Sequence, residues 1–263
     1  MSVRVCPTGC REGPPPRNGS AEAMTTTRGG RQHIPRPPGA RRGRPAPWAG
    51  IDAGARRLGL TEVRRRLADL PPDGEPPLVF EARGVDRVAE HARPAAVLLP
   101  LFEERGEARV VLTMRPDTMP SHRGEIAFPG GKLEPAVDAD LRAAALREAH
   151  EEIGLDPTSV DVVARLEGIA TVASRFVITP FVGVLPDRPV LTPDPREVEQ
   201  VFDVALSDLL GEGVYREERW DTWKLDLDVH FFELPGETVW GATARILTNF
   251  LTRLLVPGRP HPG

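Results

Sequence analysis

Three glutamates and one arginine have the types and spacing best suited to chemistry in this sequence. Arg147, Glu148, Glu151 and Glu152 lie within the segment GGKLEPAVDADLRAAALREAHEEIGL, residues 130–155. On an α-helix, which turns about 100° per residue, Glu151 lies about 60° to one side of Glu148 and Glu152 about 40° to the other. Like charges on one helical turn are destabilising. A hard cation such as Mg²⁺ would offset the repulsion, because it binds carboxylate oxygens together with substrate phosphates.

The same residues also fit a solvated helix face without any metal. Arg147 can pair with Glu151 at a spacing of four residues, as on many exposed helices. The residues around the hexapeptide REAHEE must therefore decide between a metal site and an ordinary surface.

The helix that carries these acids has recognisable ends. We expect it to begin near Asp138, a favourable N-cap type, with Asp140 adding charge that suits the helix N-terminus. Gly154, followed by Leu155, predicts the helix stop. Its apolar stripe consists of Ala145, Ala149 and Ile153, with Leu141 and Leu146 at the edges. A stripe made mostly of alanine lets the helix approach a sheet closely.

The rest of the chain supplies elements that would position this helix. A turn at 104–108 predicts a hairpin, and Gly124 with Phe128–Gly131 marks a loop that leads into the helix. Segment 197–210 fits a short helix or a strand plus turn. We expect strands at 95–102, 109–115, 160–173 and 176–185, two strands within 219–234, and helices at 54–70 and 238–255.

Charge and composition divide the chain into four parts. Residues 1–50 hold nine Arg and two Glu, a net charge of +7, so the remainder carries -11 of the total -4. This Pro- and Gly-rich segment is expected to be a disordered basic tail. We expect residues 51–93 to form a helical extension and linker, 94–255 the folded domain that carries the acid helix, and 256–263 a second disordered tail. An alternative start at Met24 would leave residues 1–23 untranslated.

Composition also excludes several classes of protein. The two cysteines, Cys6 and Cys10, predict neither a disulfide framework nor a tetrahedral zinc site. The N-terminus has no continuous apolar segment of a signal peptide, and the apolar run at 95–102 is far shorter than the about 20 residues of a membrane helix. We expect a cytoplasmic protein without membrane or nucleic-acid partners. The sequence assigns no oligomeric state.

The acid segment resembles the Nudix box of the Nudix hydrolases. The second half of that box, Arg-Glu-apolar-x-Glu-Glu-x-Gly-apolar, is matched by Arg147–Leu155. The first half departs: the usual acidic position falls on Ala139, flanked by Asp138 and Asp140, and the loop from Gly131 to Arg147 is two residues longer than usual.

A longer loop is a feature of the coenzyme A pyrophosphatase branch, which the chain also resembles upstream. The matching residues are Leu112, Thr113, Arg115, Gly124 and Phe128–Gly131, and WGATARIL at 240–247 is similar to the C-terminal pattern of that branch. Pro116 and Pro120 depart from it. Arg123 or His122 would substitute for the basic residue.

The resemblance implies an α/β fold, a Nudix α/β/α sandwich with a mixed β-sheet. It also implies hydrolysis of a nucleoside diphosphate linked to another group, here coenzyme A or its thioesters, with Mg²⁺ or Mn²⁺. The implied metal ligands are Glu148, Glu151 and Glu152, with Arg147 holding them in place. The implied substrate contacts are Arg115, Arg123, Gly130 and Gly131, with the Gly131 carbonyl as a further candidate ligand.

Several alternatives stay open. The substrate could instead be ADP-ribose, NADH or a dinucleoside polyphosphate, or the chain could be a non-catalytic Nudix-like binding module. One of the box acids, Glu197 or Glu199 could be the general base, although the last two also fit a solvated surface. Arg115 fits either a phosphate contact or a strand-end ion pair. Trp220 and Trp223 could stack a base or simply pack. No role follows for His122 or His150.

Overall fold

The computed structural model describes residues 4–5, 30, 32, 34–70, 72–73, 78–80, 92–118, 123–171, 175–222 and 225–256. Pro120, His122 and Trp223 lie outside these residues, as do most of the two predicted disordered tails, 6–29 and 257–263.

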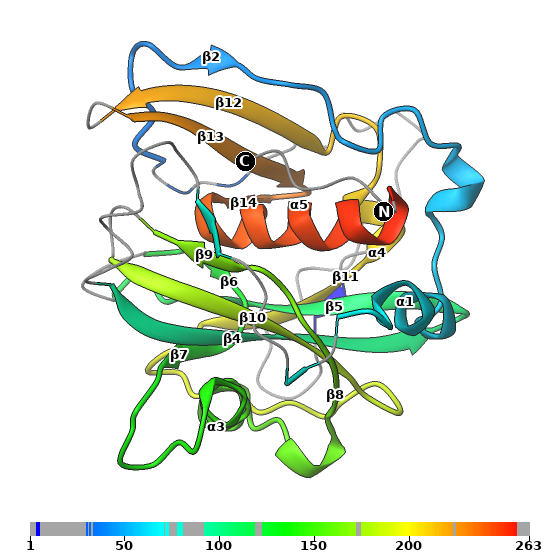
Figure 1. The fold of residues 1–263 in the computed structure, drawn as a ribbon, viewed down its shortest axis with the longest axis vertical. Coiled ribbons are helices and arrows are strands. Elements are labelled where there is room, and N and C mark those ends of the chain that lie inside the picture. Colours follow the sequence, from blue (N-terminus) through cyan, green and yellow to red (C-terminus); the bar gives the residue numbers. More distant parts are fainter. Residues whose placement is uncertain are drawn as a thin grey trace, which may run out of the picture.

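A mixed β-sheet forms the centre of the fold (Figure 1). Its strand order is β1-β11-β5-β4-β10-β9-β3, while β6 pairs with β5, β7 with β4 and β8 with β10. Strands β4 and β10 run parallel, whereas β4 and β5 form an antiparallel hairpin. The strands are β1 (Arg4–Val5), β3 (Leu78–Phe80), β4 (Arg93–Glu104), β5 (Glu107–Met114), β6 (Ile126–Ala127), β7 (Gly130–Lys132), β8 (Asp161–Arg165), β9 (Gly168–Ala170), β10 (Phe176–Val184) and β11 (Gln200–Ala205).

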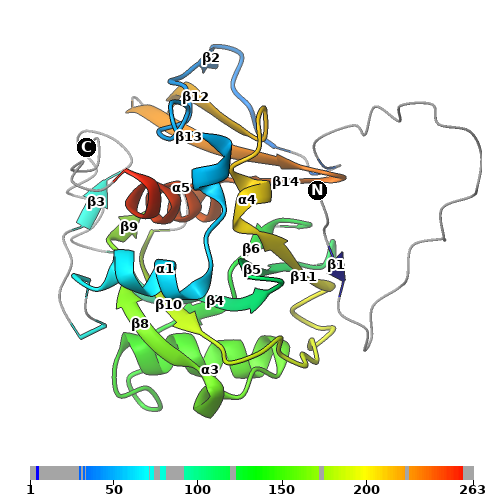
Figure 2. The ribbon, with the colours of Figure 1, turned by 90° about the vertical axis from the view of Figure 1, so that its right-hand side faces the viewer.

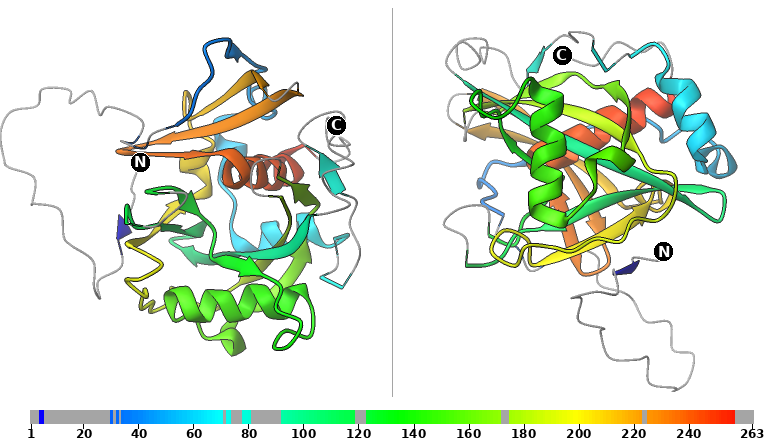
Figure 3. Two further views of the ribbon diagram at one scale, coloured as in Figure 1. Left: turned by 90° about the vertical axis from the view of Figure 1, so that its left-hand side faces the viewer. Right: turned by 90° about the horizontal axis from the view of Figure 1, so that it is seen from below.

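Helices cover both faces of this sheet, which explains why its central strands are apolar on both sides. Helix α3 (Leu141–Ile153) lies across one face, and α5 (Gly241–Leu255) lies on the other (Figures 1 and 3). These three layers are the predicted α/β/α sandwich with a mixed sheet, and this prediction is confirmed.

A second sheet adds a fourth layer beyond α5 (Figure 2). Its order is β14-β13-β12-β2, formed by β14 (Glu237–Trp240), β13 (Leu225–Leu234), β12 (Tyr215–Thr222) and β2 (Arg41–Arg42). Because α5 lies between two sheets, it is buried on nearly every side, from Ala244 to Leu255. The short elements are α1 (Leu60–Leu67), which packs beside α5, α4 (Leu206–Leu209), and the 3-10 turns η1 (Ala53–Arg56) and η2 (Pro157–Ser159).

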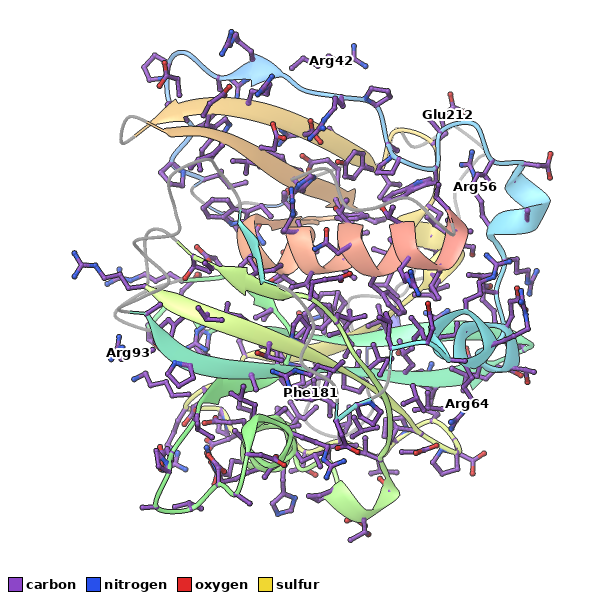
Figure 4. The ribbon with its side chains drawn as sticks, viewed as in Figure 1. Arg42, Arg56, Arg64, Arg93, Phe181 and Glu212 are labelled. Carbon is purple, nitrogen blue, oxygen red and sulfur yellow. The ribbon has the colours of Figure 1, made fainter. Side chains whose placement is uncertain are left out.

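Helix α3 approaches the central sheet through small side chains. Its face of Ala144, Ala145, Ala149 and Ile153 is fully buried in one apolar cluster with Phe181 of β10. Figure 4 shows Phe181 on the α3 side of the sheet. The predicted alanine stripe is therefore the contact face, and it places the acidic face of the same helix beside β7.

Most predicted elements exist, with four differences. Helix α3 begins at Leu141 with Asp140 as its N-cap, so the prediction of Asp138 as the cap is wrong. The predicted strand 160–173 is divided into β8 and β9, and the helix predicted at 54–70 is shorter, with a 3-10 turn before it. Strand β14 escaped prediction, because four residues directly before a long helix share its apolar pattern.

The described part of the predicted tail, residues 34–50, differs from the expected disorder. Here β2 pairs with β12, and Trp48 is only 2% exposed. The Trp48 ring stacks on Phe232 at 6.2 Å and meets the edge of Tyr215 at 5.2 Å. A composition rich in Pro and Arg hid this single aromatic residue, whose burial anchors the segment.

Among the described residues, no helix is both long and apolar enough to cross a membrane.

Trp48→Ala should lower the free energy of unfolding by about 3–5 kcal/mol, the usual cost of removing a buried aromatic side chain. Urea denaturation followed by circular dichroism would measure the change. Val190→Ala is the control, because Val190 is 84% exposed. A loss no larger than that of the control would show that residues 34–50 do not pack in solution.

A buried polar cluster joins α5 to the second sheet. His230 is 3% exposed and lies between Arg245, whose Nη1 is 2.7 Å from Nε2, and Tyr215, whose Oη is 2.8 Å from Nδ1. Glu217, 5% exposed, accepts hydrogen bonds from Arg44 and Tyr215. Burial, reinforced by the positive charges of Arg245 and Arg44, lowers the pKa of His230 well below its usual value.

This pKa predicts a loss of stability below about pH 6.5, the usual histidine pKa. The unfolded chain takes up a proton there while folded His230 stays neutral, so acid favours unfolding by up to about 1.4 kcal/mol per pH unit. We expect His230→Gln to flatten the decline in the free energy of unfolding between pH 7.5 and 5.5. Urea midpoints at both pH values would check this, and an unchanged pH dependence would contradict it.

Candidate active site

The acidic face of α3 lies beside the turn that enters it. Asp140 caps the helix by accepting a hydrogen bond from the Ala143 N–H at 2.7 Å. At the other end Gly154 has a φ of 66°, a left-handed conformation that favours glycine and ends the helix, as predicted. The last turn of α3 therefore holds its glutamates in a fixed position opposite β7.

Glu152 is the most buried acid of the cluster, with 4% exposure. Its carboxylate accepts a hydrogen bond from the Gly130 N–H at 3.1 Å. Burial, together with the negative charges of Glu148 and Glu197, raises the pKa of Glu152 to about 8, although Gly130 and Arg115 act in the opposite direction. Burying such a carboxylate in its charged form costs free energy unless a positive charge pairs with it.

Glu148 fits against Gly131, which has no side chain. A Cβ atom built on Gly131 would lie 2.5 Å from the Glu148 carboxyl carbon, closer than real contacts allow. Burial raises the pKa of Glu148 as well, and Arg147 opposes this shift. The second glycine of the Gly130–Gly131 pair is thus required for close approach of the carboxylate.

Arg147 ties the long loop to the helix. Its guanidinium donates to both oxygens of Asp138, from Nε at 2.8 Å and from Nη2 at 3.0 Å, and it pairs with Glu151 at 2.9 Å and Glu148 at 3.1 Å. These hydrogen bonds lower the pKa of Asp138, whose side chain is 2% exposed. Asp138 therefore serves the loop as the acidic partner of Arg147.

Glu151 is the most exposed of the three glutamates, with 57% of its side chain accessible. Its pairing with Arg147 matches the solvated-face alternative for this one residue. Glu148 and Glu152 do not, because both lose most of their contact with water.

The upstream motif around Arg115 also lies near the acid cluster of α3. The Arg115 N–H donates to the Glu125 carbonyl, and the Gly124 N–H donates back to the Arg115 carbonyl, so the loop after β5 closes on itself. The Nε of Arg115 is buried without a hydrogen-bond partner among the described residues. Its positive charge opposes the rise in the pKa of Glu152, so Arg115 lies close enough to act on the acid cluster.

One cleft of about 1890 Å³ brings the predicted residues together. Those that line it are Arg115, Arg123, Gly130, Gly131, Arg147, Glu148, Glu151 and Glu152. Glu197 and Glu199 line it too, although both are exposed, and Glu197 acts electrostatically on Glu148 and Glu152. His150 is outside this lining, and its Nδ1 lies 3.2 Å from the Leu155 carbonyl.

Sequence reasoning missed the role of Asp138 and the contribution of distant elements. The signal for Asp138 was the loop length: two additional residues move the acidic partner of Arg147 away from its usual spacing. No local pattern could have found Trp240 or Glu237, which line the cleft from the second sheet. Trp220 is 6% exposed and packs against Phe231 and Trp240, and it also lines the cleft.

The donor chemistry of the cluster suits a divalent cation. The described residues contain no three Asp, Glu, His or Cys side chains already gathered around one metal position. Glu148 and Glu152 are nevertheless partly desolvated carboxylates with raised pKa values that repel each other and Glu197. A bound Mg²⁺ or Mn²⁺ would relieve that repulsion, and both ions prefer carboxylate oxygens.

Comparison with known proteins identifies the family of this chain. Residues 91–224 match the model of the NUDIX domain. The chain is 45% identical over 167 residues to the chloroplastic Nudix hydrolase 22 of Arabidopsis thaliana, covering 61% of this chain but only 55% of that protein. It is 34% identical over 194 residues to the Nudix hydrolase NudL of Photorhabdus laumondii, covering 74% of this chain and 96% of that protein.

A solved structure of a NUDIX hydrolase from Alicyclobacillus acidocaldarius has a TM-score of 0.44 and 16% identity, covering 63% of this chain and 93% of that one. The domain match and the extent of the likeness to NudL define the class of protein, while the chain spans about half the length of the plant relative that it matches. The chain belongs to the Nudix family, whose hydrolases generally use divalent metals.

Gly131→Ala should displace the Glu148 carboxylate and lower metal-dependent turnover by at least about tenfold, because a shift of about 1 Å at a catalytic group has such costs. The fold should persist, since α3 packs through its alanine face. Gly39→Ala is the matched control, because a Cβ atom there would meet nothing within 4 Å. Steady-state rates with Mg²⁺ and a thermal melt of each variant would test this, and equal rates would contradict it.

Proposed function

We propose that this protein hydrolyses the diphosphate bond of coenzyme A or acyl-CoA to 3′,5′-ADP and 4′-phosphopantetheine products, with Mg²⁺ or Mn²⁺ and water. The observation that carries the proposal is the cluster of Glu148, Glu152 and Arg115 at the Gly130–Gly131 turn of the cleft. Small-ligand pockets are commonly about 300–1,000 Å³. The cleft of about 1890 Å³ suits a long substrate with an arm on each side of its diphosphate.

The acid cluster accounts for the need for a cation. A diphosphate is anionic and would be repelled by Glu148, Glu151 and Glu152. A bound divalent metal supplies neutralisation of the phosphates and lowers the pKa of a coordinated water. Glu148 and Glu152 would hold the metal, with Glu151 as the third ligand from the exposed side of the helix.

The other residues of the site would bind and orient. Arg147, held by both oxygens of Asp138, fixes the carboxylates from behind. Arg115 would contact a phosphate oxygen through its unpartnered Nε, and Arg123, with Gly130 and Gly131, would line the diphosphate path.

The general base would come from the acids that surround the diphosphate. Hydrolysis bonds the oxygen of water to one phosphorus, breaks the bond from that phosphorus to the bridging oxygen, and gives the water proton to the base. Among the acids outside α3, Glu197 has the best position, since its charge acts on both Glu148 and Glu152. It follows the loop that precedes β11, and its exposure leaves it free to reach a bound water.

A second substrate class remains an alternative. ADP-ribose, NADH and dinucleoside polyphosphates share the diphosphate and would use the same cluster. Pro120, the departure that favours them, lies outside the described residues. A non-catalytic binding module is a weaker alternative because all three box glutamates are present. The proposed setting is the cytoplasm, and the proposed reaction involves neither a membrane nor nucleic acid.

Glu152→Gln and Glu151→Gln should each lower kcat by at least about a hundredfold, because each removes a negative charge needed for metal and water activation. The thermal melt of each variant should stay close to that of the wild type. Asp161→Asn is the control, since Asp161 is exposed on β8 and pairs with Arg64. Full activity in both glutamine variants would overturn the assignment.

The substrate itself is tested with a panel. Purified protein with Mg²⁺ or Mn²⁺ is given coenzyme A, ADP-ribose, NADH and diadenosine polyphosphates, and products are resolved by mass. We expect 3′,5′-ADP and 4′-phosphopantetheine as the fastest products. Faster cleavage of another member would replace coenzyme A by that substrate class. No turnover of any member would favour the binding module.

A further inference from the structure

The charged residues of the cleft are separated into two ends. One end, which we call the basic end, carries Arg93 and Lys132 beside Phe176; Glu134, two residues after Lys132, also lines the cleft, so this end has two positive charges and one negative charge. The other, the acidic end, carries Asp117, Glu199 and Glu237. The loop at the acidic end also carries Glu125 and Arg123, so this end stays net negative.

The pairing of the strands places the Gly130–Gly131 turn between these ends. Strand β7 pairs with the first half of β4, whereas β6 pairs with the last residues of β5. Arg93 begins β4, and Lys132 lies opposite Ala95 of β4. On the far side, the Glu199 N–H donates to the carbonyl of Met114, the last residue of β5. A diphosphate at Gly130–Gly131 therefore has one end of the cleft on each side.

The basic end is built on neighbouring strands. Residues directly opposite on paired strands share a face, as do residues two apart, so the Arg93, Ala95 and Lys132 side chains emerge on one face. Arg93 is in register with Phe176 of β10, and its guanidinium lies 4.6 Å from the centre of that ring. Figure 4 shows Arg93 at the exposed beginning of β4. No carboxylate among the described residues forms an ion pair with Arg93 or Lys132.

The acidic end is centred on Glu237, the first residue of β14. Burial, together with the negative charges of Glu199 and Asp117, raises the pKa of Glu237. Its carboxylate accepts a hydrogen bond from the Gln32 side-chain Nε2 at 3.4 Å. The same Nε2 donates to the Thr238 carbonyl, and the Gln32 Oε1 accepts from the Thr238 N–H. This end has carboxylates that accept hydrogen bonds and repel a phosphate.

We propose that the basic end binds the 3′-phosphorylated nucleoside half of the substrate and that the acidic end takes its uncharged half, which donates hydrogen bonds through amide and hydroxyl groups. The identity of the substrate is taken from the proposed function. The orientation of that substrate is inferred from the distribution of charge in the cleft. Arg93 and Lys132 pair with the additional phosphate, while Phe176 offers an apolar surface to the nucleoside. The reverse orientation would place that phosphate beside Asp117, Glu199 and Glu237.

The test compares coenzyme A with dephospho-coenzyme A, which lacks only the 3′-phosphate. Arg93→Ala should raise KM for coenzyme A about tenfold, the factor that ~1.4 kcal/mol represents. The KM for dephospho-coenzyme A should stay within about twofold of the wild-type value, because that substrate has no 3′-phosphate to pair with Arg93. The kcat for both substrates should also stay within about twofold of the wild-type values. Arg93→Lys should retain most of the preference, since it keeps the charge. Arg65→Ala is the control for an exposed arginine on α1.

The opposite end supplies a second comparison. Glu237→Gln removes a charge inside the same cleft but should leave the ratio of the two KM values unchanged. If Glu237→Gln alters that ratio while Arg93→Ala does not, the orientation is reversed and the proposal is overturned.

A binding measurement separates this proposal from the proposed function. Calorimetry on the wild type should show 3′,5′-ADP binding more tightly than 5′-AMP, and Arg93→Ala should remove most of that difference. Failure of the wild type to hydrolyse coenzyme A would defeat the proposed function but not this result. Equal affinities for the two nucleotides in the wild type, or equal weakening of both by Arg93→Ala, would overturn the basic end as the phosphate subsite.

Discussion

Mutual repulsion among carboxylates is the constraint to which the rest of the site responds. Glu148 and Glu152 lie one helical turn apart, both partly removed from water, with Glu197 close enough to disfavour their charged forms. Such an arrangement is unfavourable in an isolated helix. It persists because Arg147, the Gly130 N–H and the sheet contacts of α3 hold it in place, and because a divalent cation can neutralise it.

Two features of this arrangement depend on a small side chain or on none. The alanine face of α3 allows the helix to lie close to the sheet, and Gly131 leaves the space that the Glu148 carboxylate fills. Arg147 completes the arrangement by bridging the helix and the loop through Asp138. The loop can therefore be longer than in the common box while the last turn of α3 keeps its position.

The second sheet turns the acid cluster into a cleft with two ends. Its strands lie beyond α5, and its hairpin brings Glu237 and Trp240 over the central sheet. Residues before the domain take part as well: Gln32 holds β14, and Trp48 is buried against Phe232. Because basic groups predominate at one end and acidic groups at the other, the charge of the cleft differs from one side of the Gly130–Gly131 turn to the other.

The sequence by itself predicted the acid helix and its glycine stop, because apolar periodicity and cap residues act over a few neighbours. The α/β/α sandwich followed from the resemblance of this segment to the Nudix box. It also identified Arg147, Glu148 and Glu152, since one helical turn brings them together whatever surrounds it. Only the tertiary structure decided that Asp138 pairs with Arg147 while Asp140 caps the helix, because both acids fit either role locally. Only the tertiary structure placed Arg93, Lys132 and Glu237 around one cleft. Arg93 and Lys132 are brought together by the pairing of β4 with β7, and Glu237 comes from the second sheet, more than 100 residues further along the chain, which no local pattern records.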